Sequence, residues 1–309
     1  MLPIYSLSGF NINPIKTYYN ASDSYHFIGT NDRIRIIINQ NCAKWKDLRT
    51  NQIGASMVGD AIGVSTYYNR ENENGELENT PQGAYQKKKN PIPFSNRHTE
   101  RGHEYEPVAA YCLEKVTGLK CYNGFIWKYK SPYHTIDPWN RFGCSPDRCV
   151  IDVEPHFTEH DYETKDPSEW TLTPNHHLTY GVEIKCPESP KENIPNEYMA
   201  QMQYQALIMN VPVVFFCEMV VDTNIDELKY LKIKKVFRNE TYINWMMERV
   251  CKFSDCLKNN VVPDWGQVAF SDIPYVYTQD VNIEARHYRE ITTKDIKREK
   301  GAEKEPKFW

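Results

Sequence analysis

An alternating run at residues 180–187 is the feature that most constrains how this chain can fold. Within it, Glu183 and Lys185 are separated by one apolar residue and flanked by others. Side chains on a β-strand point to opposite faces in turn, so we expect Glu183 and Lys185 on one face and their apolar neighbours in the core. Asp147 follows Ser-Pro at the start of another strand-like run. On a neighbouring strand, Asp147 would place its carboxylate beside Glu183.

These residue types together indicate a particular chemistry. Two carboxylates and a backbone carbonyl are hard oxygen ligands that suit Mg²⁺ or Mn²⁺. The ammonium of Lys185, next to them, can hold or deprotonate a water molecule for attack on a phosphodiester. The pattern therefore predicts a metal-dependent nuclease site. The competing interpretation, a solvated strand with salt-bridged side chains, is the less favoured one.

The composition limits the class of protein without identifying it. A chain of 309 residues can bury a full core, and its formal net charge of −4 argues against a protein that coats DNA through bulk electrostatics. A local basic strip can still hold phosphates. The candidate strips are residues 87–89 and 229–235, although a solvated charged face is the simpler interpretation of each.

Two absences bear on the compartment. The sequence has no run of eighteen apolar residues and no basic-then-apolar start, so we expect neither a membrane span nor a secretory signal. Its nine cysteines include no CxxC pair, which favours free thiols in a reducing, intracellular compartment. His156 and His160, in a polar stretch at 154–178, are expected to be surface residues rather than metal ligands.

Apolar periodicity predicts an α/β (α+β) protein with a mixed central β-sheet flanked by helices. We expect a loop at 69–96, because that segment is rich in Asn, Glu, Gly, Lys and Pro. Ser56 is suitably placed to cap a helix that opens at Ala55. The expected strands are 33–38, 119–129, 145–153, 179–186, 212–221 and 228–237, and the other expected helices are 45–49, 97–117, 194–209 and 241–257.

Five blocks of sequence, in order, carry a resemblance over about half of the chain. The chain resembles the phage lambda exonuclease-type family of viral recombination nucleases, within the PD-(D/E)xK superfamily. The Asp…Glu-x-Lys element is moderately specific alone, and it becomes strong when Cys-Pro and a Tyr-x-x-Gln helix follow it. The blocks are Trp45-x3-Arg49 with Ala55-Ser56, Gly102 to Pro107, Ser145 to Asp147, Val182 to Pro187, and Tyr198 to Tyr204.

The resemblance implies a restriction-endonuclease-like core and assigns roles to individual residues. Asp147 and Glu183, joined by the Ile184 carbonyl, would be ligands of Mg²⁺ or Mn²⁺, with two ions expected. Glu106 would be a further ligand or would position metal-bound water. Lys185 would orient or activate the attacking water.

A second group of residues would handle the DNA. Arg49 and Ser56 match the family's pocket for a terminal 5′-phosphate, and a guanidinium is a bidentate phosphate partner in general. Gln201, with Tyr198, would line the site from the following helix. One departure is Arg148, because the family usually has Gly there. A backbone angle reserved for glycine is then doubtful, or Arg148 reaches toward DNA.

The resulting hypothesis is a metal-dependent exonuclease that digests duplex DNA in the 5′-to-3′ direction for viral or phage recombination or replication. Residues 41–258 would form the nuclease domain, between an N-terminal extension at 1–40 and a C-terminal extension or tail at 259–309. The resemblance also implies a homotrimer and a single-strand annealing protein as partner. Two alternatives stay open: a structure-selective or nicking endonuclease, and an inactive DNA-binding scaffold.

Overall fold

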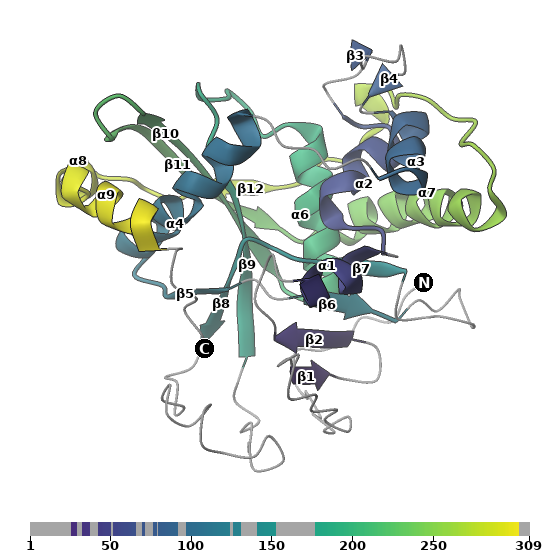
Figure 1. The fold of residues 1–309 in the computed structure, drawn as a ribbon, viewed down its shortest axis with the longest axis horizontal. Helices are drawn as coiled ribbons and strands as arrows, with labels where there is room; N and C mark the ends of the chain where they lie inside the picture. Colours follow the sequence, from purple (N-terminus) through teal and green to yellow (C-terminus); the bar gives the residue numbers. More distant parts are fainter. Residues whose placement is uncertain are drawn as a thin grey trace.

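The computed structural model describes residues 26–29, 33–37, 43–50, 52–65, 70–71, 77–78, 80–91, 97–123, 126–130, 141–152 and 177–302. Most of the expected N-terminal extension lies outside these ranges, as do His156 and His160. The expected fold class, a mixed sheet flanked by helices, is confirmed (Figure 1).

A six-stranded sheet forms the centre of the molecule, with the strand order β12-β11-β10-β9-β8-β5. β10 and β9 are parallel, and the other neighbouring pairs in this sheet are antiparallel. The register places Glu183 of β9 opposite Phe216 of β10. The strands are β5 (Cys121–Asn123), β8 (Arg148–Asp152), β9 (His177–Lys185), β10 (Val213–Asp222), β11 (Glu227–Phe237) and β12 (Thr278–Asp280).

Helices cover both faces of this sheet (Figure 1). Alternation along β10 sends Phe215 into the apolar cluster beneath α4 and Phe216 into the cluster beneath α6. Val182 and Ile184 pack in the α4 cluster as well, so Glu183 is left on the α6 side. The two-face alternation expected for this strand is therefore confirmed. The helices concerned are α2 (Ala55–Ile62), α4 (Arg97–Thr117), α6 (Asn196–Met209) and α7 (Glu240–Asn259).

A smaller antiparallel sheet, in the order β1-β2-β6-β7, lies next to helix α1 (Ala43–Thr50) (Figure 1). A parallel bridge joins Ile53 to Phe142, and the Ile53 amide donates to the Arg141 carbonyl at 2.7 Å. These contacts tie the connection between α1 and α2 to β7, and so fix the end of α1 that carries Arg49. The strands are β1 (His26–Gly29), β2 (Arg33–Ile37), β6 (Ile126–Tyr129) and β7 (Phe142–Cys144).

Two expectations of local structure are wrong. The strand expected at 119–129 is two strands, β5 and β6, which belong to different sheets. The loop expected at 69–96 contains the short hairpin β3 (Arg70–Glu71) and β4 (Leu77–Glu78) and the helix α3 (Pro81–Lys89). The Thr80 hydroxyl caps α3 by accepting from the Gly83 amide at 3.1 Å. Thr80-Pro81 is a sequence signal for the start of a helix. The prediction of a loop gave more weight to the polar composition of the segment than to this signal.

Residues 259–302, expected as an extension or tail, pack onto the same fold. β12 pairs with β11 at the edge of the six-stranded sheet. Helix α8 (Ala285–Glu290) and helix α9 (Thr293–Ala302) follow, and Ile296 of α9 is buried in the cluster beneath α4. The Lys300 ammonium donates to the Tyr105 hydroxyl at 3.1 Å and to the Asp226 carboxylate at 2.8 Å. α9 is therefore fastened to α4.

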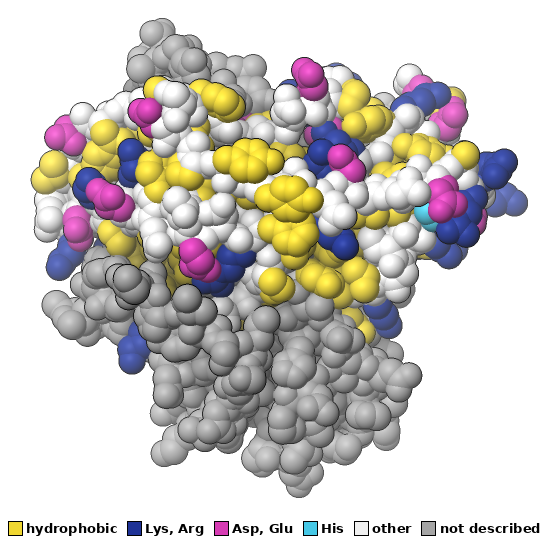
Figure 2. All heavy atoms as spheres, turned by 180° about the vertical axis from the view of Figure 1, so that it is seen from behind, with side chains coloured by type: hydrophobic (Ala, Val, Ile, Leu, Met, Phe, Trp, Pro, Cys, Tyr) yellow, Lys and Arg dark blue, Asp and Glu magenta, His cyan; other side chains and the backbone are white. Residues whose placement is uncertain are grey.

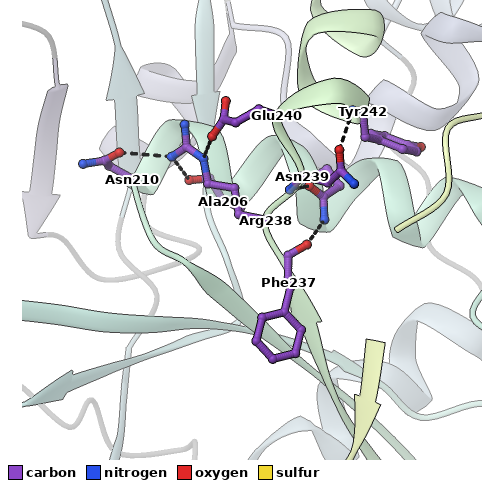
Figure 3. Close-up of polar contacts among 8 residues, drawn as sticks. Ala206, Asn210, Phe237, Arg238, Asn239, Glu240 and Tyr242 are labelled. Carbon is purple, nitrogen blue, oxygen red and sulfur yellow. Dashed lines mark hydrogen bonds and ion pairs between the residues drawn. The ribbon is translucent and has the colours of Figure 1, made fainter. Parts of the chain in front are cut away.

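The C-terminal end of α6 is held by the segment between β11 and α7 (Figure 3). The Arg238 guanidinium donates to the Ala206 carbonyl at 3.2 Å and to the side chain of Asn210 at 3.0 Å, and it pairs with Glu240. Asn239 caps α7 by accepting from the Tyr242 amide at 2.9 Å. The Asn239 cap satisfies an amide that the start of α7 would otherwise leave unpaired, and the Arg238 contacts fix the end of α6 against this segment.

The surface carries charges of both signs. Figure 2 shows Lys and Arg interspersed with Asp, Glu and hydrophobic side chains on the described part of the face opposite to that of Figure 1. DNA contact there would depend on local groups rather than on one continuous basic face. No helix within the described ranges is both long and apolar enough to span a membrane. The cysteines in those ranges are all free thiols.

Candidate active site

Glu183 is the most enclosed acid of the site, with 1% of its side chain exposed. Its Oε1 accepts from the Gln201 amide at 2.6 Å, and its Oε2 accepts from the Gln205 amide at 2.6 Å. The Lys185 ammonium forms an ion pair with Oε1. Because Gln201 and Gln205 are four residues apart on α6, they share one helix face and hold both carboxylate oxygens at once. A buried charge of this kind persists only with such partners.

Asp147 lies immediately before β8, beside Glu183 as expected. The antiparallel pairing of β8 with β9 sets Arg148 opposite Val182, and the Asp147 Oδ2 accepts from the Ile184 amide at 2.6 Å. Burial, and then the nearby Glu183 and Glu106 carboxylates, raise the pKa of Asp147 well above its usual range. The fold thus brings like charges together, and a bound cation would relieve the repulsion between them.

Lys185 is held as a cation. Burial lowers its pKa, but the Glu183 and Asp147 carboxylates outweigh burial and raise the pKa above its ordinary value. Its ammonium also lies 4.8 Å from the ring centroid of Tyr198 on α6. Of the two roles left open by the sequence, orienting a water molecule or deprotonating it, this environment favours orientation and charge stabilisation.

Glu106, on α4, forms an ion pair with Arg148. Its side chain is 15% exposed and that of Arg148 is 12% exposed. The same Nη1 atom of Arg148 donates to the Asp147 carbonyl at 2.7 Å. Arg148 is absent from the described residues that have positive φ, so replacing glycine there requires no left-handed backbone. Its guanidinium is directed at the acidic group of α4.

Arg49 lies in the last turn of α1 and interacts electrostatically with Asp147. Its guanidinium stacks 4.0 Å from the centroid of the Trp45 ring. Burial lowers the pKa of Arg49, and interaction with Cys144 and Asp147 opposes that effect. The candidate phosphate ligand and the candidate metal ligand therefore share one electrostatic environment.

Lys88 of α3 adds a second cation beside Arg49. Its ammonium donates to the carbonyls of Thr50 at 2.5 Å and Gln52 at 2.7 Å. Burial and the charge of Arg49 lower the pKa of Lys88 to about 8. Two partly buried cations in one place suit an anionic ligand.

The structure corrects one detail of Ser56. Helix α2 begins at Ala55, its N-cap is Gly54, and no side chain supplies a capping hydrogen bond. Ser56 is an exposed residue within the first turn, so the expected N-cap role is wrong. A serine hydroxyl in the first turn of a helix can still donate a hydrogen bond to an anion bound at that end. Its phosphate contact stays a prediction.

Sequence reasoning missed two residues of this site. Gln205 was one, although its spacing of four from Gln201 placed it on the same helix face. Lys88 was noted only as part of a basic strip in an expected loop, and recognising helix α3 would have fixed its direction. Gln205 holds the carboxylate of Glu183, and Lys88 adds a positive charge beside Arg49.

The oxygen donors fit a divalent cation. Asp147, Glu183 and the Ile184 carbonyl are the kinds of ligand that Mg²⁺ and Mn²⁺ prefer, and burial, followed by the neighbouring negative charges, raises the pKa of Asp147. Within the described ranges, no three His, Cys, Asp or Glu side chains are grouped closely enough to hold a metal ion. The carboxylate of Glu106 is engaged with Arg148 instead of joining the other two.

Comparisons with solved structures find exonucleases at low sequence identity and low TM-score. Solved structures with a similar fold include an alkaline exonuclease from Laribacter hongkongensis, at 18% identity and a TM-score of 0.45, covering 71% of this chain and 94% of that one. The same enzyme with dAMP gives 20% identity, a TM-score of 0.46 and the same coverage. A phage-related exonuclease from Haemophilus somnus gives 14% identity and a TM-score of 0.40, covering 68% of this chain and 96% of that one. No curated protein sequence matches.

The family follows from the sequence itself. Residues 44–211 match the model of the YqaJ-like viral recombinase domain, and this match spans more than half of the 309 residues. The match covers every residue to which we assigned a role in the site. The resemblance to lambda exonuclease-type enzymes is thereby confirmed, and with it the expected class of DNA exonucleases acting in recombination. The chain belongs to the YqaJ-like viral recombinase domain family.

Proposed function

We propose that this protein is a divalent-cation-dependent exonuclease that hydrolyses duplex DNA from 5′ ends. The observation that carries the proposal is the convergence of Asp147, Glu183 and Lys185 where β8 begins and β9 ends, with α6 side-chain amides fixing Glu183. Such an arrangement of two acids and a cation is costly to bury and is kept for chemistry rather than for stability.

Asp147, Glu183 and the Ile184 carbonyl would hold Mg²⁺ or Mn²⁺. Such an ion lowers the pKa of bound water and neutralises charge on a phosphate. Gln201 and Gln205 keep the Glu183 carboxylate in a single orientation. Lys185, held as a cation, orients the attacking water and stabilises the negative charge that develops on the phosphate.

End recognition is assigned to the cations beside the carboxylates. Arg49 would bind the terminal 5′-phosphate through its guanidinium, Lys88 would add a second positive charge, and Ser56 would contribute a hydroxyl. The electrostatic interaction of Arg49 with Asp147 supports this assignment, because a DNA end bound by Arg49 would then be near the hydrolytic groups. A homotrimer and a single-strand annealing protein are further proposals, taken from the family resemblance.

The test is digestion of linear duplex DNA, labelled at either end, with 5′-phosphate or 5′-hydroxyl termini. Products should shorten from the 5′ end in Mg²⁺ or Mn²⁺, and EDTA should stop the reaction. Asp147→Asn keeps the size of the side chain but removes its charge, and should be inactive. Asp272→Asn makes the same change at an exposed residue that has no role in the proposed site, and this variant should digest DNA as the parent does.

The two alternatives have distinct outcomes in the same assay. Efficient cutting of closed circular duplex would favour the endonuclease. Binding of DNA without cleavage in either metal would favour the inactive scaffold, and would contradict the proposed chemistry.

A further inference from the structure

The carboxylates of this site are largely neutralised by the chain's own cations. Glu183 is paired with Lys185, and Glu106 is paired with Arg148. With Glu106, Asp147 and Glu183 ionised, as a bound cation would favour, and with Arg49 of α1 left aside, these three acids together with Lys185 and Arg148 carry −3 + 2 = −1. Without the charge of Arg148 the same group would carry −2. The arginine therefore removes one unit of net negative charge from the groups that would attract metal ions.

Arg148 is also placed firmly. Its backbone pairs with Asn123 of β5 and Val182 of β9, so the residue lies inside the sheet rather than in a loop. Its guanidinium donates to the Asp147 carbonyl and forms an ion pair with the Glu106 carboxylate, and 12% of its side chain is exposed. A charge-assisted pair with so little exposure is much stronger than one in water. A cation in this position both occupies Glu106 and repels a further cation.

We propose that Arg148 takes the place of a second divalent cation, so that this site binds one ion tightly, on Asp147, Glu183 and the Ile184 carbonyl. This inference rests on the proposed function and refines the expectation of two ions. Glu106 is then a positioning residue: it holds Arg148 across the site instead of ligating metal. Arg148 in turn supplies permanently the positive charge that a second ion would supply on binding.

The test counts Mn²⁺ ions bound by the full-length protein, from the electron paramagnetic resonance signal of free Mn²⁺, without DNA or turnover. The parent should bind one ion tightly per chain. Arg148→Gln removes the charge and keeps a long polar side chain, and its second ion should bind at least about tenfold more tightly than in the parent. Arg148→Lys keeps the charge and should behave as the parent does.

The combined variant Arg148→Gln with Glu106→Gln should lose the gained ion, because the second site needs the released carboxylate. Circular dichroism would verify that each variant is folded. Two tight ions in the parent, or no gain in folded Arg148→Gln, would overturn the inference while leaving the metal centre intact. Absence of any tight ion in the parent, with the same result in Asp147→Asn, would instead contradict the proposed metal centre and the inference together.

Discussion

The Gln205 amide should be as important to the metal site as a ligand is, although it touches no substrate. Gln205 is fully buried, and its amide donates to Oε2 of Glu183 at 2.6 Å. Leucine has a similar size but cannot donate, so Gln205→Leu leaves that oxygen without this partner inside the protein. A hydrogen bond to a charged group contributes about 1.5–3 kcal/mol. We expect the free energy of unfolding, measured by urea denaturation in EDTA, to fall by that amount.

The same change should weaken Mn²⁺ binding by roughly ten- to a hundredfold, the usual effect of removing a group that orients a ligand. Gln203→Leu is the matched control. Gln203 is also fully buried on α6, but it bonds the Phe237 carbonyl and the Asn239 amide, both at 2.8 Å. Two neutral hydrogen bonds contribute about 1–3 kcal/mol together, so stability should fall alike while Mn²⁺ affinity is kept. Equal Mn²⁺ affinity in the two variants would refute this reasoning.

Four further predictions concern catalysis and end recognition. Asp147→Ala should abolish cleavage while DNA binding by gel shift persists, and Lys185→Ala should slow single-turnover cleavage by roughly a hundredfold or more. Arg49→Ala should erase a preference for 5′-phosphate over 5′-hydroxyl ends on the order of ten- to a hundredfold; a parent without that preference would contradict the clamp. The preference should also decline as pH rises from 7 to 9, because the lowered pKa of Lys88, about 8, means that its ammonium becomes neutral there. Lys88→Met should make the preference lower and independent of pH in that range, and an unchanged pH profile would count against Lys88.

The core of the site could be predicted from the sequence because it obeys a short-range rule. The period of two along β9 sends Val182 into one cluster and Glu183 toward α6, and the structure agrees. The position of Asp147 beside Glu183 followed from the assumption that adjacent strand-like runs pair, which they do. Local alternation and neighbouring strands are what a single sequence reports most reliably.

Contacts between distant segments could not be predicted in the same way. Arg148 was flagged as unusual, but its partner Glu106 lies 42 residues earlier on a helix across the sheet. The basic strip at 229–235 shows the same limit. Lys232 in that strip is buried and forms an ion pair with Glu218 of the neighbouring strand at 3.1 Å, while also donating to the Lys191 carbonyl. The local sequence around a charged residue among apolar ones does not predict whether its side chain contacts solvent, DNA or a buried acid.

The packing of α9 argues that the functional unit extends well past the expected boundary at residue 258. Lys300 forms ion pairs with Glu104 and Asp226 at 2.8 Å each, and Ile296 is 1% exposed in the core beneath α4. Glu104 is two residues before Glu106 on the same helix, so a displacement of α4 would move the acid that holds Arg148. Removing α9 would take Ile296 away and expose the part of α4 that it covers, at a cost of about 25 cal/mol for each Å² of apolar surface. We infer that residues 259–302 stabilise the geometry of the site from behind, and that a fragment ending at 258 would lose part of the support of α4.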